Sequence, residues 1–376
     1  MPQLRLALAQ VDPTVGDLAG NARLVRHWAA KAQQAGAHLV AFPEMVLTGY
    51  PVEDLALRTS FVEASRTALE RLAADLREDG LGDLPVIMGY LDRAGVSGVG
   101  TGGANPGDPG DRNVDLEFES RPDVATPKGE PQNAAAVLVG GRVAARYAKH
   151  HLPNYGVFDE FRIFVPGRDL TVVRIRGVDV AVAICEDLWQ DGGPVALTRR
   201  AGAELLLVIN GSPYERDKDD VRRELVTRRA AEAGCALAYV NMVGGQDDLV
   251  FDGDSIVVSA TGDVLARGPQ FEEALVVVDL DLPLDATHEA PPTVENVRHV
   301  VISDDAAKPY EPLPAPVAEP LDGVAEVYAA LVLGLRDYAR KNVFRSVILG
   351  LSGGIDSTVV AAIACDALGA QNVVGV

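Results

Sequence analysis

The feature that most restricts the fold is a short apolar run, residues 180–184, which ends at Cys185 and is followed at once by Glu186 and Asp187. Such a run predicts a buried strand. A side chain directly after a buried strand is held by a rigid element yet faces the loop side of a sheet, where reactive groups are commonly placed. Cys185 is therefore either a nucleophile or an ordinary core cysteine, since free cysteine is among the most buried residue types.

Further apolar runs alternate with helical patterns along the first 280 residues. The patterns predict strands over 4–10, 38–42, 85–91, 133–139, 142–148, 171–176, 179–184, 204–209, 235–241, 255–259, 264–267 and 274–280. They predict helices over 17–35, 61–78, 194–201 and 220–233. Tight hairpins, such as the one at Gly140-Gly141, are mixed with helical crossovers. We therefore expect an α/β domain with two sheets packed face to face and helices outside.

Two stretches of different composition divide the chain. Residues 95–132 are dense in Gly, Pro and acidic side chains and are interpreted as a mobile surface insertion. Residues 282–320 are rich in Pro and acidic side chains, which predicts a semi-stiff extended linker. A helix over 322–341, a strand over 345–351, a helix over 358–368 and the start of a strand over 372–376 follow. We predict a first domain over 1–281 and the truncated first part of a second domain over 321–376, because one strand–helix–strand unit cannot bury its faces alone.

Composition limits the function and the compartment. The formal net charge of −20 argues against non-specific binding to nucleic acid or to anionic membranes. The sequence contains no apolar run long enough to span a membrane, and its N-terminus does not resemble an export signal. The three cysteines form neither a disulfide framework nor a metal-binding spacing, so we expect the reducing cytoplasm.

Two more reactive side chains directly follow predicted strands. Glu44 lies where poor solvation would raise its pKa toward that of a general base, and Lys149 could stabilise a thiolate or an oxyanion. The alternatives are a loop carboxylate bound by backbone N–H groups and a solvated surface lysine. His150 and His151 are interpreted as structural, because adjacent residues on a strand point to opposite faces. Together with Cys185, Glu44 and Lys149 form a base, a cation and a nucleophile suited to attack on an amide carbon.

Three segments resemble the signature segments of the nitrilase, or carbon–nitrogen hydrolase, superfamily. They are Phe42-Pro43-Glu44, Lys149-His150-His151-Leu152-Pro153 and Ile184-Cys185-Glu186-Asp187-Leu188-Trp189, and they occur in the family's order. The resemblance implies a four-layer αββα sandwich in which Cys185 attacks, Glu44 accepts a proton and Lys149 supports the tetrahedral intermediate. It also implies a thioester intermediate and an additional glutamate, Glu160, near the triad.

A second motif, residues 349–357, joins a predicted strand to a predicted helix through Ser352-Gly353-Gly354-Ile355-Asp356-Ser357. Glycines let backbone N–H groups approach a phosphate, and a helix N-terminus adds its positive end. The alternative is a tight turn that uses glycine only for packing. The Walker lysine is missing, and the motif resembles instead the pyrophosphate loop of N-type ATP pyrophosphatases, within a doubly wound parallel domain. The resemblance implies ATP contacts at Gly350, Leu351, Ser352, Gly353, Gly354, Ile355, Asp356 and Ser357, with Mg²⁺ at Asp356.

Together the two motifs resemble a family of glutamine-dependent amidotransferases that make NAD⁺. The implied substrates are L-glutamine, ATP and deamido-NAD⁺, and the implied assembly is a homo-oligomer. The alternatives are a stand-alone nitrilase-type amidase and a non-catalytic assembly fragment. The resemblance places the glutamine site at Tyr155, Ser212, Lys218, Glu160, Tyr50 and Phe158. Asp252 and Asp254 are interpreted as structural acids of a turn.

Overall fold

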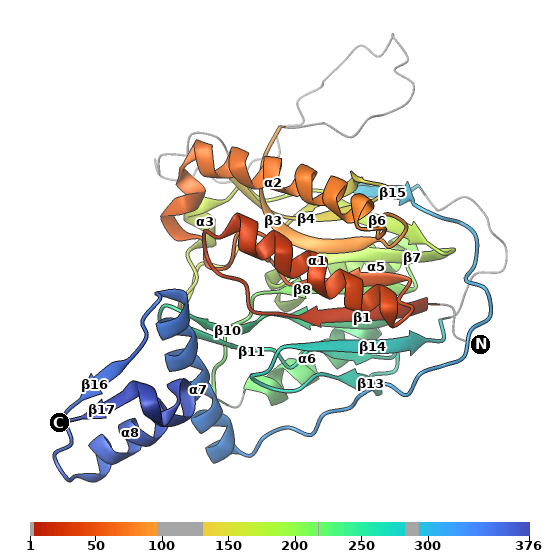
Figure 1. The fold of residues 1–376 in the computed structure, drawn as a ribbon. Helices are drawn as coiled ribbons and strands as arrows, with labels where there is room; N and C mark the ends of the chain where they lie inside the picture. The colour runs from red at the N-terminus through yellow and green to blue at the C-terminus, as the bar shows by residue number, and fades with distance from the viewer. Residues whose placement is uncertain (1–3, 96–130, 217, 283–292) are drawn as a thin grey trace.

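Two β-sheets packed face to face form the centre of the computed structural model, which describes residues 4–95, 131–216, 218–282 and 293–376 (Figure 1). The first sheet has the strand order β14-β1-β2-β3-β4-β5. Its strands, in chain order, are β1 (Leu4–Gln10), β2 (Leu39–Ala41), β3 (Val86–Arg93), β4 (Pro131–Val139), β5 (Arg142–Ala148) and β14 (Ala274–Leu280).

The second sheet has the strand order β13-β12-β9-β8-β7-β6-β15. Its strands are β6 (Leu170–Ile175), β7 (Val178–Ile184), β8 (Leu205–Asn210), β9 (Ala236–Asn241), β12 (Ile256–Val258), β13 (Val264–Arg267) and β15 (Val297–Val301). Strands β7, β8 and β9 are parallel neighbours at its centre. Every residue of these three strands is buried. This is the burial expected of parallel strands covered on both faces.

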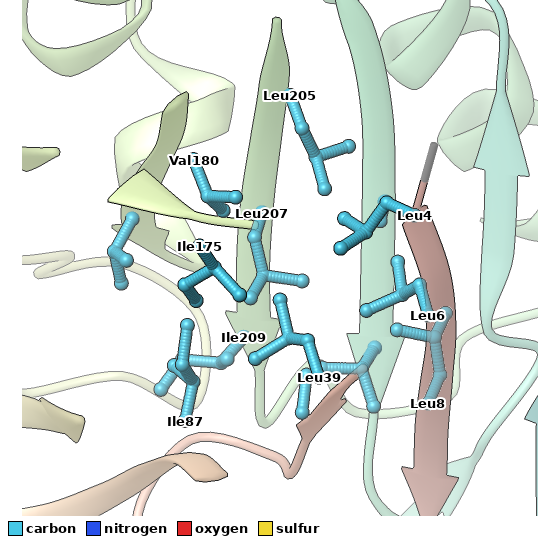
Figure 2. Close-up of a cluster of buried hydrophobic side chains, with 14 of the residues drawn as sticks. Leu4, Leu6, Leu8, Leu39, Ile87, Ile175, Val180, Leu205, Leu207 and Ile209 are labelled. Atoms are coloured by element: carbon cyan, nitrogen blue, oxygen red, sulfur yellow. The ribbon is translucent and has the colours of Figure 1, made fainter. Parts of the chain in front are cut away.

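Alternating side chains divide each strand between two apolar layers. Leu4, Leu6 and Leu8 of β1 point toward Leu205 and Leu207 of β8, in the layer between the sheets (Figure 2). The intervening alanines of β1 instead pack against the outer helices of the first sheet, as the two-residue period of a strand requires. The sequence prediction of face-to-face sheets is confirmed.

Helices cover the outer face of each sheet and complete an αββα sandwich. Helices α1 (Leu18–Gln34) and α2 (Thr59–Glu78) contribute apolar faces to the layer outside the first sheet. Helices α5 (Gly193–Ala201) and α6 (Lys218–Ala233) do the same for the second sheet. Three short helical turns lie near the sheet ends: η1 (Glu53–Leu57), α3 (Glu160–Ile163) and α4 (Glu186–Trp189).

The stretch predicted as an extended linker, 282–320, contains a strand that the sequence did not predict. Strand β15 joins the second sheet by parallel pairing with β6. Farther along, the Arg267 backbone N–H donates to the Pro316 carbonyl at 2.9 Å, and the Leu313 N–H donates to Asp279 at 2.7 Å. Prolines removed the periodicity that would have predicted these contacts, yet Pro is compatible with an extended edge segment. The described part of this stretch, residues 293–320, is therefore bound to the sandwich (Figure 1).

A smaller C-terminal unit follows this stretch. It comprises α7 (Gly323–Lys341), β16 (Val347–Leu349), α8 (Ile355–Leu368), η2 (Ala370–Asn372) and β17 (Val373–Gly375). Strand β17 pairs parallel to β16, with α8 as the crossover, so the predicted start of a parallel α/β unit is confirmed. Many of its apolar side chains are exposed, including Val324, Ile348 and Ile355.

Helix α7 joins this unit to the sandwich by packing on a hairpin of β10 (Val243–Gln246) and β11 (Leu249–Asp252). The Gly245 N–H donates to Asp337 of α7 at 2.8 Å. Glycine is needed at position 245 for this contact, because a Cβ built there would lie 2.9 Å from the Gly334 Cα. Lys341 adds an ion pair with Asp12 at 2.6 Å. The hairpin was not predicted, since Val243-Gly-Gly-Gln246 lacks strand-like alternation.

The remaining differences concern boundaries. Residues 131 and 132, which were assigned to the insertion, belong to β4, and residues 96–130 lie outside the described residues. Helix α6 begins at Lys218, two residues before its predicted start. Among the residues that the structure describes, no helix is long and apolar enough to cross a membrane.

Candidate active site

Glu44, Lys149 and Cys185 come together at one end of the sandwich, as the sequence predicted. Cys185 directly follows β7, Lys149 directly follows β5, and Glu44 lies three residues after β2. The Lys149 Nζ lies 2.7 Å from the Glu44 Oε1. All three residues are buried: Cys185 is 4% exposed, Lys149 1% and Glu44 0%. The simple alternative of a solvated surface lysine is therefore excluded.

The backbone at Cys185 is held in an unusual conformation. Its φ of 42° and ψ of −96° lie outside the regions that an L-residue ordinarily adopts. The Cys185 N–H donates to the Ile209 carbonyl at 3.0 Å, and its carbonyl accepts from the Leu188 N–H at 2.9 Å. These bonds hold a sharp turn between β7 and α4, and strain of this kind is concentrated at functional positions.

Glu44 is fixed from several directions. Its Oε2 accepts from the Gly211 N–H at 2.7 Å, and its Oε1 accepts from the Asn133 amide at 2.6 Å in addition to the contact with Lys149. A second carboxylate, Glu160, lies 2.8 Å from the Lys149 Nζ. Lys149 is therefore a buried cation shared by two carboxylates.

The electrostatics define the resting state of the site. Burial and the charge of Glu44 raise the pKa of the Cys185 thiol well above its ordinary value, although Lys149 opposes them. Burial lowers the pKa of Lys149, but the attraction of Glu160 and Glu44 outweighs it, so the net pKa is raised. The resting site thus holds a neutral thiol beside a lysine ammonium. Ionisation of the thiol requires a nearby base, and Glu44 is placed for that role.

Glu160 gives the structure a pH-dependent stability. Burial raises the pKa of Glu160 to about 7, the Lys149 charge lowers it and the Glu44 charge raises it. A carboxyl group whose pKa is higher in the folded state binds protons on folding, so its contribution to stability falls as the pH rises through the interval between its unfolded and folded pKa values. We expect the free energy of unfolding of the wild type, relative to Glu160→Gln, to fall from pH 5 to pH 7. Urea unfolding at several pH values measures this, with Glu224→Gln at an exposed helix position as the control. A difference that does not change with pH would contradict the prediction.

The loop after β5 is anchored by Asp187. Its Oδ1 accepts from the backbone N–H groups of His150 and His151, at 3.1 and 2.8 Å, and its Oδ2 accepts from the Tyr147 hydroxyl at 2.6 Å. Contrary to the prediction, the two histidines do not lie on opposite faces of a strand, because β5 ends at Ala148 and their rings are in contact with a centroid distance of 4.6 Å. Their backbone contacts nevertheless agree with a structural role.

A pocket of about 410 Å³ opens above Cys185. Four of the six predicted glutamine-site residues line it: Tyr155, Phe158, Ser212 and Lys218. The other lining residues are Cys185, Glu186, Trp189, Glu215, Arg216 and Val221. Glu215 and Arg216 were missed, because charged residues in a loop carry no distinguishing pattern.

The two remaining glutamine-site residues, Tyr50 and Glu160, stay predictions, and neither is among the residues that line this pocket. The Tyr50 hydroxyl donates to the Glu160 Oε1 at 2.9 Å, and both side chains are buried beside the Lys149–Glu44 pair. Glu160 is therefore near the triad, as the family resemblance implied, whereas Tyr50 orients it. Glu186 does line the pocket and accepts from the Tyr155 hydroxyl at 2.8 Å.

Asp252 and Asp254, which were interpreted as structural acids of a turn, are both buried. Asp252 pairs with Arg222 of α6 through contacts of 2.9 and 3.1 Å, and all three side chains are almost fully buried. Asp252 also accepts from Asn241, whose amide bonds both the N–H and the carbonyl of Ser212. This network fixes the wall of the pocket.

The glycine-rich loop lies apart, between β16 and α8. Gly353 has a φ of +81°, in the region that favours glycine, and a Cβ built there would meet nothing within 4 Å. The Ser352 and Ser357 hydroxyls lie 3.2 Å apart across the loop. Asp356 is exposed in the first turn of α8. The loop is open at Gly350 and Gly353, carries two hydroxyls and leads into the N-terminus of α8, which suits a phosphate ligand.

A buried Glu, Lys and Cys at the strand ends of an αββα sandwich define a carbon–nitrogen hydrolase. The carbon–nitrogen hydrolase family model matches residues 5–286, so this chain belongs to that family. The NAD synthase model matches residues 327–376, which corresponds to the C-terminal unit.

Known proteins resemble both parts. A glutamine-dependent NAD(+) synthetase of Thermotoga maritima is 39% identical over 100% of this chain and 60% of its own length. The solved structure of a glutamine-dependent NAD+ synthetase from Acinetobacter baumannii, in complex with ADP, is 32% identical, with a TM-score of 0.76 over 99% of this chain and 59% of that one. A mutant amidase from Nesterenkonia, with an acetamide moiety added covalently at its active-site cysteine, is 27% identical, with a TM-score of 0.56 over 74% of this chain and 90% of that one. The chain thus spans about three fifths of the length of the curated relative.

Proposed function

We propose that this chain hydrolyses the side-chain amide of L-glutamine and supplies the ammonia to a glutamine-dependent NAD⁺ synthetase reaction. The observation that carries the proposal is the buried Cys185–Lys149–Glu44 cluster beneath a polar pocket, in a chain whose C-terminal unit matches the NAD synthase model. Relatives that match both parts favour this function over a stand-alone amidase and over a non-catalytic assembly fragment.

In the proposed reaction the Cys185 Sγ attacks the amide carbon while Glu44 accepts the thiol proton. Lys149 stabilises the negative charge on the carbonyl oxygen of the tetrahedral intermediate. When the carbon–nitrogen bond breaks, Glu44 returns the proton to the leaving nitrogen, which releases ammonia and leaves a thioester on Cys185. Water, deprotonated by Glu44, then opens the thioester to glutamate and regenerates the thiol.

The pocket chemistry supports glutamine as the substrate. Lys218 and Arg216 offer cations for an α-carboxylate, while Glu186 and Glu215 offer carboxylates for an α-ammonium group. The Lys218 Nζ lies 2.9 Å from Glu215 and 3.1 Å from the Pro213 carbonyl, so it is held at the pocket. A zwitterion with an uncharged amide at its far end is the ligand class that this arrangement suits.

The C-terminal unit is proposed to begin the site that adenylates the carboxylate of deamido-NAD⁺ with ATP and passes it to ammonia. Residues 350–357 would hold phosphate oxygens through backbone N–H groups, and the open glycine positions leave room for them. Asp356 would contribute a carboxylate to Mg²⁺ bound to those phosphates, and the ion would supply charge neutralisation. Within the described residues no cluster of three or more metal-ligating side chains exists, which fits an ion held largely by the nucleotide.

We also propose a homo-oligomer in the cytoplasm as the working form. All three cysteines are free thiols, which suits a reducing compartment. The exposed apolar side chains of the C-terminal unit suit burial against further protein.

The proposal is tested by incubating the protein with L-glutamine and measuring glutamate and ammonia. We expect hydrolysis of glutamine and little hydrolysis of asparagine, because a side chain one methylene shorter cannot reach both Cys185 and the charged pocket rim. Absence of glutamine hydrolysis by a folded protein, with or without ATP and deamido-NAD⁺, would refute the glutaminase function.

A further inference from the structure

We propose that Asn133 is a positioning residue that holds the two carboxylates of the site and directs the proton balance between them, an inference that deepens the glutaminase function proposed above. Asn133 lies near the start of β4 and is 1% exposed. Its amide Nδ2 donates to the Glu44 Oε1 at 2.6 Å and lies 3.3 Å from the Glu160 Oε1. One NH₂ group therefore bridges both carboxylates.

The orientation of this amide is fixed by its surroundings. The Asn133 Oδ1 is buried and has no hydrogen-bond partner. The reverse orientation would place that oxygen against two carboxylates and would lose both bonds, so the NH₂ group must face them. A buried acceptor without a partner destabilises the fold. The two bonds that the Asn133 NH₂ group donates to the carboxylates offset this loss. The Asn133 carbonyl also accepts from the Lys149 N–H at 2.8 Å, so one residue positions all three charged groups.

The Asn133 amide joins two groups of a site in which two carboxylates face one ammonium group. Glu44 and Glu160 share the single cation Lys149, and two like charges in a buried site cannot both ionise freely. A donor that binds the charged form of a carboxylate favours that form. The shorter bond goes to Glu44, so Asn133 holds the carboxylate of the proposed base more closely than it holds Glu160. The other titratable groups that face Glu44 are Tyr50, Lys149, Glu160 and Cys185.

The sequence offered only a weak signal for this role. Asn133 is the polar residue that opens an otherwise apolar run, Ala134–Val139, directly after the glycine-rich stretch. Its partner Glu44 is 89 positions away in the chain, and only the folded sheet brings the two together.

The test compares Asn133→Leu with wild type, since leucine has a similar volume and lacks both N–H donors. We expect kcat/KM for glutamine to fall by on the order of 10- to 100-fold, mainly through kcat, because Asn133 does not line the pocket. The acidic limb of the pH profile should move to higher pH, because the carboxylate pair loses a donor that binds its charged form. Asn21→Leu, at a buried asparagine bonded to Thr14 and Leu47, serves as the matched control and should leave the limb in place.

A substrate-independent readout separates this proposal from the glutaminase function. The rate of Cys185 alkylation by iodoacetamide, followed by mass spectrometry of the Cys185 peptide, reports thiol ionisation directly. We expect its acidic limb to move to higher pH in Asn133→Leu even if glutamine is not the substrate. A folded Asn133→Leu protein whose alkylation limb and kcat coincide with those of wild type would overturn the positioning role.

Discussion

Replacing Cys185 with alanine should abolish glutamine hydrolysis, with a loss on the order of 10⁴-fold or more, as expected when a covalent nucleophile is removed. The fold should remain, because Cys185 is a small side chain at the end of β7 and the turn is held by its backbone bonds to Ile209 and Leu188. Removal of the sulfur also removes the thiol that lines the pocket and that is proposed to form the thioester. Measurement of ammonia release with glutamine, together with circular dichroism and the melting temperature, tests the prediction.

The chain contains a matched control for this experiment. Cys235 is also buried, 3% exposed, but it packs in the layer outside the second sheet, away from the triad. Cys235→Ala should retain glutamine hydrolysis while losing a comparable amount of side-chain volume. In a longer protein with a complete synthetase unit, Cys185→Ala should preserve NAD⁺ synthesis from free ammonia. Retention of glutamine hydrolysis by Cys185→Ala would show that Cys185 is a core cysteine.

The central part of the fold and the three reactive residues followed from local sequence. Each apolar run is bounded by glycine, proline or polar residues, so strand positions could be assigned by pattern. Because reactive residues after strand ends gather at the edge of a sheet, Glu44, Lys149 and Cys185 could be placed together before any distance was known. Their roles stay predictions until the variants are measured.

The missed features depend on partners distant in sequence. Strand β15 is recognisable only through its pairing with β6, more than a hundred residues earlier. Hairpin β10–β11 requires glycine at position 245 for the close approach of α7, so packing rather than strand propensity decides this residue. Tyr50 was predicted to wall the glutamine pocket, but nothing in the sequence indicated that its hydroxyl donates to Glu160. A sequence motif identifies such residues as near the site but does not define their orientation.

Replacing Arg222 with methionine should give the largest loss of stability among the substitutions considered, about 3–5 kcal/mol, the range for removing one partner of a buried ion pair. Arg222 contributes both contacts of 2.9 and 3.1 Å to the buried carboxylate of Asp252. Asp254 would keep its ion pair with Arg267 at 2.6 Å, whereas Asp252 would retain only the Asn241 amide. The free energy of unfolding in urea measures the effect.

Arg223→Met is the control, because Arg223 is the next residue of α6, is 55% exposed and pairs with Asp220 only at 3.7 Å. An exposed pair of this kind contributes at most about 1 kcal/mol. Adding Asp252→Leu to Arg222→Met should recover part of the stability, since the unpaired buried charge is then removed. The double variant should not recover glutamine hydrolysis to the same extent, because Asn241 loses the carboxylate that helps to position it against Ser212. Equal losses in the free energy of unfolding for Arg222→Met and Arg223→Met would show that Arg222 does not stabilise the buried Asp252 carboxylate.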